Sequence, residues 1–316
     1  MPPSIAPVHS MSFPSLEQRL SELRALVETR LAEYARLAPD SPVRLTQAMD
    51  YSLMAGGKRM RPALVLMACE ACGGEAEDAL PAACAIEMVH TYSLIHDDLP
   101  AMDNDDFRRG RPTNHKKYGE ATAILAGDGL LTMAFEVLAR DIQPPALAAA
   151  CVVDLASAAG PLGMVGGQQA DLEGEGRYDG EPGPPSRRIA SVEQLESIHK
   201  RKTGRLLCSA LTIGGRIAGA TPKILRSLQI YGESVGLAFQ IADDLLDVTG
   251  DPSRMGKAVR KDADAQKMTY PALLGEAESR RRAEGLVHRA CDAVSELGAR
   301  SRHLVELAHY IIERDH

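Results

Sequence analysis

The chain has 316 residues, of which 45% are hydrophobic and 25% are charged, an ordinary balance for one large globular domain or two smaller ones. Acidic residues outnumber basic ones by 43 to 36, giving a net charge of −7, and Trp is absent. These features argue against a nucleic-acid partner. No run of about 18 consecutive apolar residues occurs, so we expect no transmembrane segment. The scattered cysteines indicate a reducing, cytoplasmic compartment.

Residues 1–14 lack both a basic start and an apolar stretch, and we expect them to form a disordered lead. Over residues 15–316, apolar side chains recur at three- and four-residue steps, which predicts a single all-α domain with a bundle of about ten or more helices around a central cavity. Residues 173–188 are rich in Gly, Pro and charge, and they predict a mobile loop within this domain. Helix breaks are expected at 39–40, 56–57, 73–74, 110–112, 144–145 and 160–161.

A first acidic cluster, Asp97, Asp98 and Asp103, follows an apolar helical run. Pro100 should end that helix after Asp98, and an irregular turn would then return Asp103 to the same place. Because Asp is also common at helix ends and turns, a capping cluster is the alternative interpretation.

A second acidic cluster, Asp243, Asp244 and Asp247, shares one helix face with Gln240. The surrounding residues are apolar, and stacked carboxylates there would repel each other unless a cation binds. Two such clusters in one chain predict a Mg²⁺ site that is completed by substrate phosphate. Mn²⁺ is possible as a substitute.

Basic residues occur near these helices, and they are typical of a site for diphosphates. Residues 199–204 are expected to open a helix, where free N–H groups favour anions. The candidate cations are Lys58, Arg61, Arg108, Arg109, Lys202, Lys257 and Lys267.

The chain resembles the trans-isoprenyl diphosphate synthase family, and most of all its bacterial farnesyl diphosphate synthases. The motifs that carry the resemblance are GGKRMRP (56–62), HTYSLIHDDLPAMDNDDFRRGRPTNH (90–115), LAGDGLL (125–131), GGQQADL (166–172), KTG (202–204), FQIADDLLDVTGD (239–251) and GKAVRKDADAQKMTYPALLG (256–275). The resemblance implies the isoprenoid synthase fold, a homodimer and three Mg²⁺ ions. It also implies condensation of isopentenyl diphosphate with dimethylallyl and geranyl diphosphate to give (2E,6E)-farnesyl diphosphate, with geranyl and geranylgeranyl diphosphate as alternative products.

The resemblance also implies roles for individual residues. Metal ligands or their supports would be Asp97, Asp98, Asp103, Asp243, Asp244 and Asp247. The allylic diphosphate would contact Arg108, Lys202, Lys257 and Lys267, and isopentenyl diphosphate would contact Lys58, Arg61, His90 and Arg109. Thr203 and Gln240 would line the reacting carbons.

Product length is expected to depend on the depth of the apolar cavity below Asp97. Helix geometry places Ser93 on the same face as Asp97, one turn before it, and favours Ser93 as a wall residue. The resemblance instead implies that Tyr92 is the floor, because a bulky aromatic there accompanies a C15 product. A plain core aromatic is the alternative role for Tyr92.

Other functions compete with this prediction. Glu87-x-x-His90 and Glu196-x-x-His199 have the spacing of ferritin-like di-iron proteins, although that assignment leaves the Asp clusters unexplained. A terpene cyclase would carry a different second motif, and a non-catalytic subunit would lack one cluster. Neither cluster is lost here.

Overall fold

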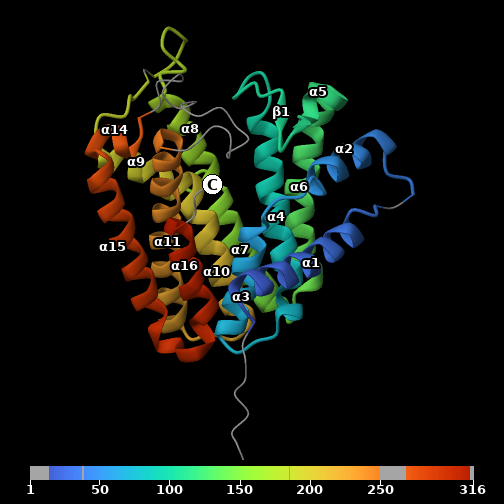
Figure 1. Ribbon diagram of the computed structural model, residues 1–316. Helices are drawn as coiled ribbons and strands as arrows, with labels where there is room; N and C mark the ends of the chain where they lie inside the picture. Colours follow the sequence, from blue (N-terminus) through green and yellow to red (C-terminus); the bar gives the residue numbers. More distant parts are fainter. Residues whose placement is uncertain (1–13, 38, 185, 250–267, 314–316) are drawn as a thin grey trace, which may run out of the picture.

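The computed structural model describes residues 14–37, 39–184, 186–249 and 268–313, and most of its long helices run along a common direction (Figure 1). The N-terminal half contains α1 (Leu16–Tyr34), α2 (Val43–Leu53), α3 (Met60–Ala71), η1 (Ala76–Ala79), α4 (Leu80–Asp97), β1 (Phe107–Arg108), β2 (Arg111–Pro112), α5 (Asn114–Tyr118) and α6 (Glu120–Asp141). The C-terminal half contains α7 (Pro145–Ala159), α8 (Met164–Gly174), α9 (Val192–His199), η2 (Lys200–Gly204), α10 (Arg205–Ile217), α11 (Pro222–Thr249), α14 (Tyr270–Leu274), α15 (Glu276–Val294), η3 (Ser295–Ser301) and α16 (Arg302–Glu313). The predicted all-α class is confirmed.

Helix α4 is the central element, and it packs against α6 and α3. Most of its residues are apolar and buried around the whole helix, and Ala82, Ile86 and Val89 are fully buried. A helix that is hydrophobic all round belongs inside a core, which explains the long apolar run of the sequence here. Helix α11 packs against α15 and α10. Both α4 and α11 reach the end of the bundle where β1, α8 and α14 lie (Figure 1).

A short hairpin follows α4, and the sequence analysis did not predict it. Strands β1 and β2 pair antiparallel through Phe107 with Pro112 and Arg108 with Arg111. The two connecting residues, Arg109 and Gly110, have φ values of 53° and 72°. Two successive positive φ values are the geometry of a tight two-residue hairpin turn. Strands of two residues are too short to show an alternating pattern, so periodicity does not reveal them.

The helix opening expected at residues 199–204 is wrong. Helix α9 continues through η2, a π-helical turn, directly into α10, and the residues at both junctions have right-handed helical φ/ψ values. A turn inside a continuous helix has no free N–H groups to offer an anion. The side chains of η2 therefore carry its chemistry. The prediction failed because a glycine next to a cluster of basic residues is also typical of a helix start.

Two helical stretches are long and apolar enough to cross a membrane on length and composition alone, Glu120–Asp141 and Pro145–Gly174. The sequence analysis did not detect these stretches, because it looked for an unbroken run of about 18 apolar residues. In the two apolar windows, 44% and 39% of the residues are buried within the fold. Because the core helices of soluble proteins pass the same test, these stretches are weak evidence for a membrane span.

The loop expected at residues 173–188 begins two residues later than predicted, because α8 extends to Gly174. An ion pair joins Arg188 to Asp179 at 2.5 Å, and Arg177 donates a hydrogen bond to the backbone carbonyl of Met102 beside the first acidic cluster. Helices of one bundle precede and follow this loop (Figure 1). Of the predicted lead, residues 1–13 lie outside the described residues.

Candidate active site

The first acidic cluster folds back on its own helix. Helix α4 ends at Asp97, and Asp98 caps it. The backbone N–H of Asp103 donates to the carbonyl oxygen of Asp97 at 2.8 Å. This bond places the two ends of the cluster side by side, as the sequence analysis expected of an irregular turn after Asp98.

The carboxyl group of Asp97 lies in a setting that disfavours its charge. The pKa of Asp97 is raised from 3.8 to about 6, because burial and the neighbouring Asp103 raise it more than Lys202 and Arg108 lower it. A buried carboxylate beside another one is stabilised when a cation binds between them. Asp97 and Asp103 therefore have the donor chemistry that a divalent metal requires.

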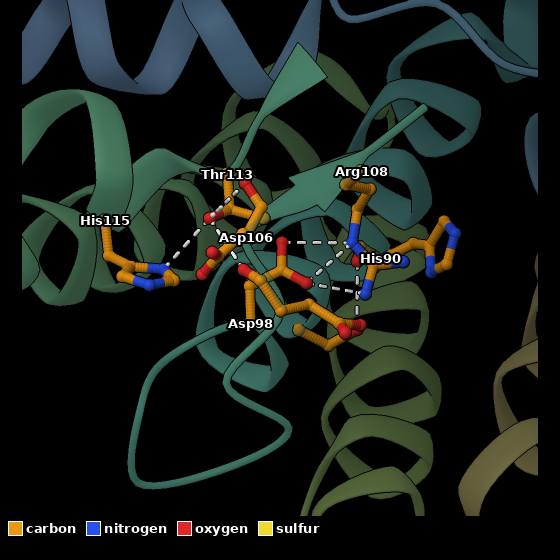
Figure 2. Close-up of polar contacts among 8 residues, drawn as sticks. His90, Asp98, Asp106, Arg108, Thr113 and His115 are labelled. Atoms are coloured by element: carbon orange, nitrogen blue, oxygen red, sulfur yellow. Dashed lines mark hydrogen bonds and ion pairs between the residues drawn. The ribbon is translucent and has the colours of Figure 1, made fainter. Parts of the chain in front are cut away.

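Asp98 has a different partner from its neighbour. It is 3% exposed, and its oxygens accept hydrogen bonds from Nε and Nη2 of Arg108 at 2.7 to 3.0 Å. Figure 2 shows Arg108 reaching Asp98 from the hairpin. This forked ion pair fixes the direction of the Arg108 side chain.

A second set of contacts holds the loop between Asp103 and the hairpin (Figure 2). The hydroxyl of Thr113 donates to the carbonyl oxygen of Asp105 at 2.8 Å and lies 3.1 Å from Nδ1 of His115. Both Thr113 and His115 are buried. The sequence analysis did not assign them a role, although both belong to its motif at 90–115.

The predicted isopentenyl cations gather around the loop before α3. Nη1 of Arg61 lies 3.3 Å from Nε2 of His90, and Arg109 donates to the carbonyl oxygen of Gly56. Burial lowers the pKa of His90 well below 6.5, and Arg61 and Arg109 lower it further. His90 is therefore a neutral imidazole that can accept a hydrogen bond from Arg61. Lys58 is exposed on the same loop.

The backbone of this loop needs glycine where Arg109 crosses it. Gly57 has a φ of 124°, and a Cβ there would lie 2.7 Å from Cζ of Arg109. The second glycine of the GG pair thus has a steric reason.

The second wall of the site is built by η2 and α11. Thr203 donates a hydrogen bond to Oε1 of Gln240 at 2.6 Å, which joins two residues predicted to line the reacting carbons. Lys202 forms an ion pair with Asp171 of α8 at 2.6 Å. The sequence analysis did not single out Asp171, although it lies in the GGQQADL motif.

Close packing of glycines brings these elements together. A Cβ on Gly167 of α8 would lie 2.2 Å from the backbone N of Lys202, and one on Gly236 of α11 would lie 3.2 Å from Cα of Gly204. At Gly167 only a residue without a side chain allows this approach, and at Gly236 a methyl group would make a tight contact.

The second acidic cluster lies on α11, and its members differ in burial. Asp244 is 9% exposed and accepts the backbone N–H of Tyr270 at 2.9 Å, so it links α11 to α14. Asp243 and Asp247 are half-buried. The predicted cations Lys257 and Lys267 lie outside the described residues.

Electrostatic coupling connects the two walls. Lys202 on η2 lowers the pKa of Asp97 on α4, in opposition to burial. Burial lowers the pKa of Arg61, while Glu87 and Asp243 act to raise it. These effects link α4 to η2 and α3 to α11, because charges influence each other's pKa only over short distances.

The two chain-length candidates differ in orientation. Tyr92 is 6% exposed and packs edge-on against His96, with ring centroids 5.7 Å apart. Ser93 is half-buried and donates to the carbonyl oxygen of His90.

No group of three or more His, Cys, Asp or Glu side chains among the described residues is placed to hold a metal ion. Mg²⁺ commonly takes only one or two protein carboxylates and fills its shell with water and phosphate oxygens. The carboxylates of Asp97, Asp103 and Asp243, within reach of cations that suit a diphosphate, fit this mode of binding.

The two glutamates of the di-iron alternative form ion pairs with basic side chains. Glu87 accepts from Arg59 at 2.5 Å, and Glu196 pairs with Lys200 and Arg282. Both glutamates serve as partners of cations.

Comparison with known proteins decides the family. The sequence model described as "Polyprenyl synthetase" matches residues 42–300. The chain belongs to the polyprenyl synthetase family. It is 49% identical over 263 residues to the farnesyl diphosphate synthase of Geobacillus stearothermophilus, which covers 82% of this chain and 84% of that protein. It is therefore a prenyltransferase.

Other members of the family are nearly as similar. The geranylgeranyl diphosphate synthase of Cyanophora paradoxa is 43% identical over 298 residues, with 94% of this chain and 95% of that protein covered. An apo crystal structure of an FPP/GFPP synthase from Zymomonas mobilis has a TM-score of 0.81 at 35% identity, covering 94% of this chain and 98% of that one. The family assignment removes the ferritin-like alternative.

Proposed function

We propose that this prenyltransferase condenses isopentenyl diphosphate with dimethylallyl and then geranyl diphosphate to give (2E,6E)-farnesyl diphosphate. The observation that carries the proposal is geometric: Asp98 of the first acidic cluster holds Arg108, and Thr203, the residue after Lys202, donates to Gln240 on the helix of the second cluster. Similarity to a farnesyl diphosphate synthase at 49% identity supports the C15 product.

The reaction begins with rupture of the allylic C–O bond. Arg108 and Lys202 stabilise the negative charge that develops on the departing diphosphate. Asp98 and Asp171 hold these two cations in place. Asp97, Asp103 and Asp243 would hold three Mg²⁺ ions, with Asp98, Asp244 and Asp247 in support. When bound, Mg²⁺ adds Lewis-acid charge at the leaving group.

The second substrate lies against the other cations. Lys58, Arg61 and Arg109 bind the diphosphate of isopentenyl diphosphate, and neutral His90 accepts a hydrogen bond from Arg61 and so orients it. The π electrons of its double bond form the new C–C bond to the allylic carbon. A proton then leaves the adjacent carbon, and the released diphosphate accepts it. Thr203 and Gln240 line this region.

Lys257 and Lys267 complete the allylic diphosphate site in this proposal. They lie outside the described residues, and the motif at 256–275 is their support.

The test is a chain-length assay. Purified protein is incubated with dimethylallyl diphosphate, isopentenyl diphosphate and Mg²⁺, and Mn²⁺ replaces Mg²⁺ in a parallel reaction. We expect a C15 product as the main species. A dominant C10 or C20 product would overturn the assignment of product length, and the absence of any product would overturn the proposed reaction.

We further propose a cytoplasmic homodimer. Apolar side chains are exposed on three consecutive helices, α6, α7 and α8: Ile124 (44%), Leu125 (56%), Val153 (61%) and Val165 (49%). A second copy that covers this surface would remove it from water and would account for the two apolar stretches without a membrane.

A further inference from the structure

Arg59 has an unusual position among the cations of the loop before α3. It caps α3 with φ 48° and ψ 37°, a left-handed conformation that is uncommon for any residue except glycine. Its side chain is 1% exposed, whereas the neighbouring Lys58 is exposed. A strained backbone persists only where the surroundings fix it.

Those surroundings come from three different helices. Nη1 donates to Oε1 of Glu87 on α4 at 2.5 Å, and Nη2 donates to the carbonyl oxygen of Leu53, the last residue of α2, at 2.6 Å. Nε lies 3.8 Å from Oε1 of Glu28 on α1. Glu87 itself is 2% exposed. Arg59 therefore ties one loop to α1, α2 and α4 together.

Two of the cations assigned to isopentenyl diphosphate lie close to Arg59 in the chain. Lys58 precedes Arg59 directly, and Arg61 follows two residues later. Glu87 lies one helical turn before His90, the partner of Arg61. The ion pair thus fixes both halves of the subsite, the loop through Arg59 and α4 through Glu87.

We propose that Glu87 and Arg59 are positioning residues for isopentenyl diphosphate. The pair turns one arginine of the motif inward, and this fixes the backbone from which Lys58 and Arg61 reach the diphosphate. The inference rests on the proposed function, because it presupposes that this loop binds isopentenyl diphosphate.

Removal of the Glu87 charge has two opposite effects on the affinity for isopentenyl diphosphate. Loss of a carboxylate near Arg61 and Arg109 leaves more positive potential at the subsite, which by itself would tighten the binding of a diphosphate. Loss of the anchor would displace Lys58 and Arg61 and would weaken it. Because Glu87 is 2% exposed and its carboxylate accepts a hydrogen bond from Arg59, we expect displacement to dominate.

The first experiment is the steady-state kinetics of Glu87→Gln. We expect the KM for isopentenyl diphosphate to rise by about tenfold or more, with kcat and the KM for dimethylallyl diphosphate within about twofold of the wild type. Asp154→Asn is the matched control, because it breaks the Arg216–Asp154 ion pair between α7 and α10. It should lower the melting temperature and leave both KM values unchanged.

A second variant separates positioning from stability. Arg59→Met with Glu87→Leu removes both charges and leaves apolar side chains of similar length, so the melting temperature should stay near that of the wild type. The KM for isopentenyl diphosphate should nevertheless remain raised. This variant also tests the inference if Glu87→Gln does not fold.

Several outcomes would overturn the inference. They are an unchanged or lowered KM for isopentenyl diphosphate in a folded Glu87→Gln protein, an equal rise for both substrates, and a normal KM in the double variant. Absence of turnover in the wild type would instead count against the proposed function itself, so the two failures are distinguishable.

Discussion

The individual residues of the first acidic cluster have distinct environments despite their adjacency. Asp97 has a raised pKa, whereas Asp98 forms an ion pair with Arg108. A sequence pattern identifies such a cluster but cannot assign partners, because those partners come from elements far along the chain. For the same reason, the sequence analysis missed Asp171 as the partner of Lys202 and considered Glu87 only as a ligand in the di-iron alternative.

The raised pKa of Asp97 predicts a pH dependence of stability in metal-free protein. Between pH 3.8, its ordinary pKa, and about pH 6, the folded chain holds a proton at Asp97 that the unfolded chain has released. The free energy of unfolding should therefore fall as the pH rises through this interval. Relative to Asp97→Asn, the melting temperature of the wild type should decline from about pH 4 to about pH 6.5.

Thermal melts of both proteins in chelator test this prediction. Parallel curves would contradict it. Addition of Mg²⁺ with diphosphate above pH 6 should restore stability to the wild type more than to the variant, because binding to the folded state stabilises it.

Tyr92 allows a prediction about product length. Its ring fills space next to His96 on α4, and truncation would open that space below Asp97. We expect Tyr92→Ala to make chains longer than C15 in the chain-length assay. Ser93→Ala is the control on the face predicted from helix geometry. An unchanged product from Tyr92→Ala would show that Tyr92 does not limit the length of the product.

At the scale of elements, sequence patterns located most of the helices and their breaks. The pairs Gly56-Gly57 and Gly73-Gly74 and the prolines at 39, 112, 144 and 161 all fall between helices. Proline lacks an N–H and glycine tolerates positive φ, so these breaks are local properties. The hairpin and the π turn depend on tertiary contacts, and local patterns missed both.

The contact between α8 and η2 gives an element-scale prediction. Gly167→Ala places a methyl group 2.2 Å from the backbone N of Lys202, so the two elements must separate. We expect a loss of about 1–3 kcal/mol in stability, as for other overpacked sites, and a lower kcat as Lys202 and Thr203 move.

Gly285→Ala in α15 is the matched control for this substitution. A Cβ there meets nothing within 4 Å, and the helix should gain about 0.5–1 kcal/mol. Chemical denaturation measures both changes. Equal effects of the two substitutions would contradict the steric account.

At the scale of the whole molecule, the all-α class and the family could be predicted from the sequence. That the two acidic clusters face each other across the site stays a prediction. The exposed apolar side chains of α6 to α8 could not be predicted. Apolar residues are expected both in the core of a bundle and between two copies of a chain, so the sequence does not distinguish the two.

The proposed homodimer is tested by Leu125→Glu. A charge at this 56% exposed position should weaken association, because it would be desolvated between two copies. Size-exclusion chromatography with light scattering should then show a monomer. Tyr310→Glu on α16, with 41% exposure, is the control and should stay dimeric. A wild type that is already monomeric would contradict the proposal.

The π turn at Lys200–Gly204 also limits how this chain can change in length. Insertions and deletions within residues 175–184 alter a surface connection whose ends can adjust. Deleting one residue from the turn would rotate everything beyond it by about 100° relative to everything before it. Thr203 would then lose Gln240, and α10 would present a different face to its neighbours. Natural variation in length should therefore be common in the loop and rare in the turn.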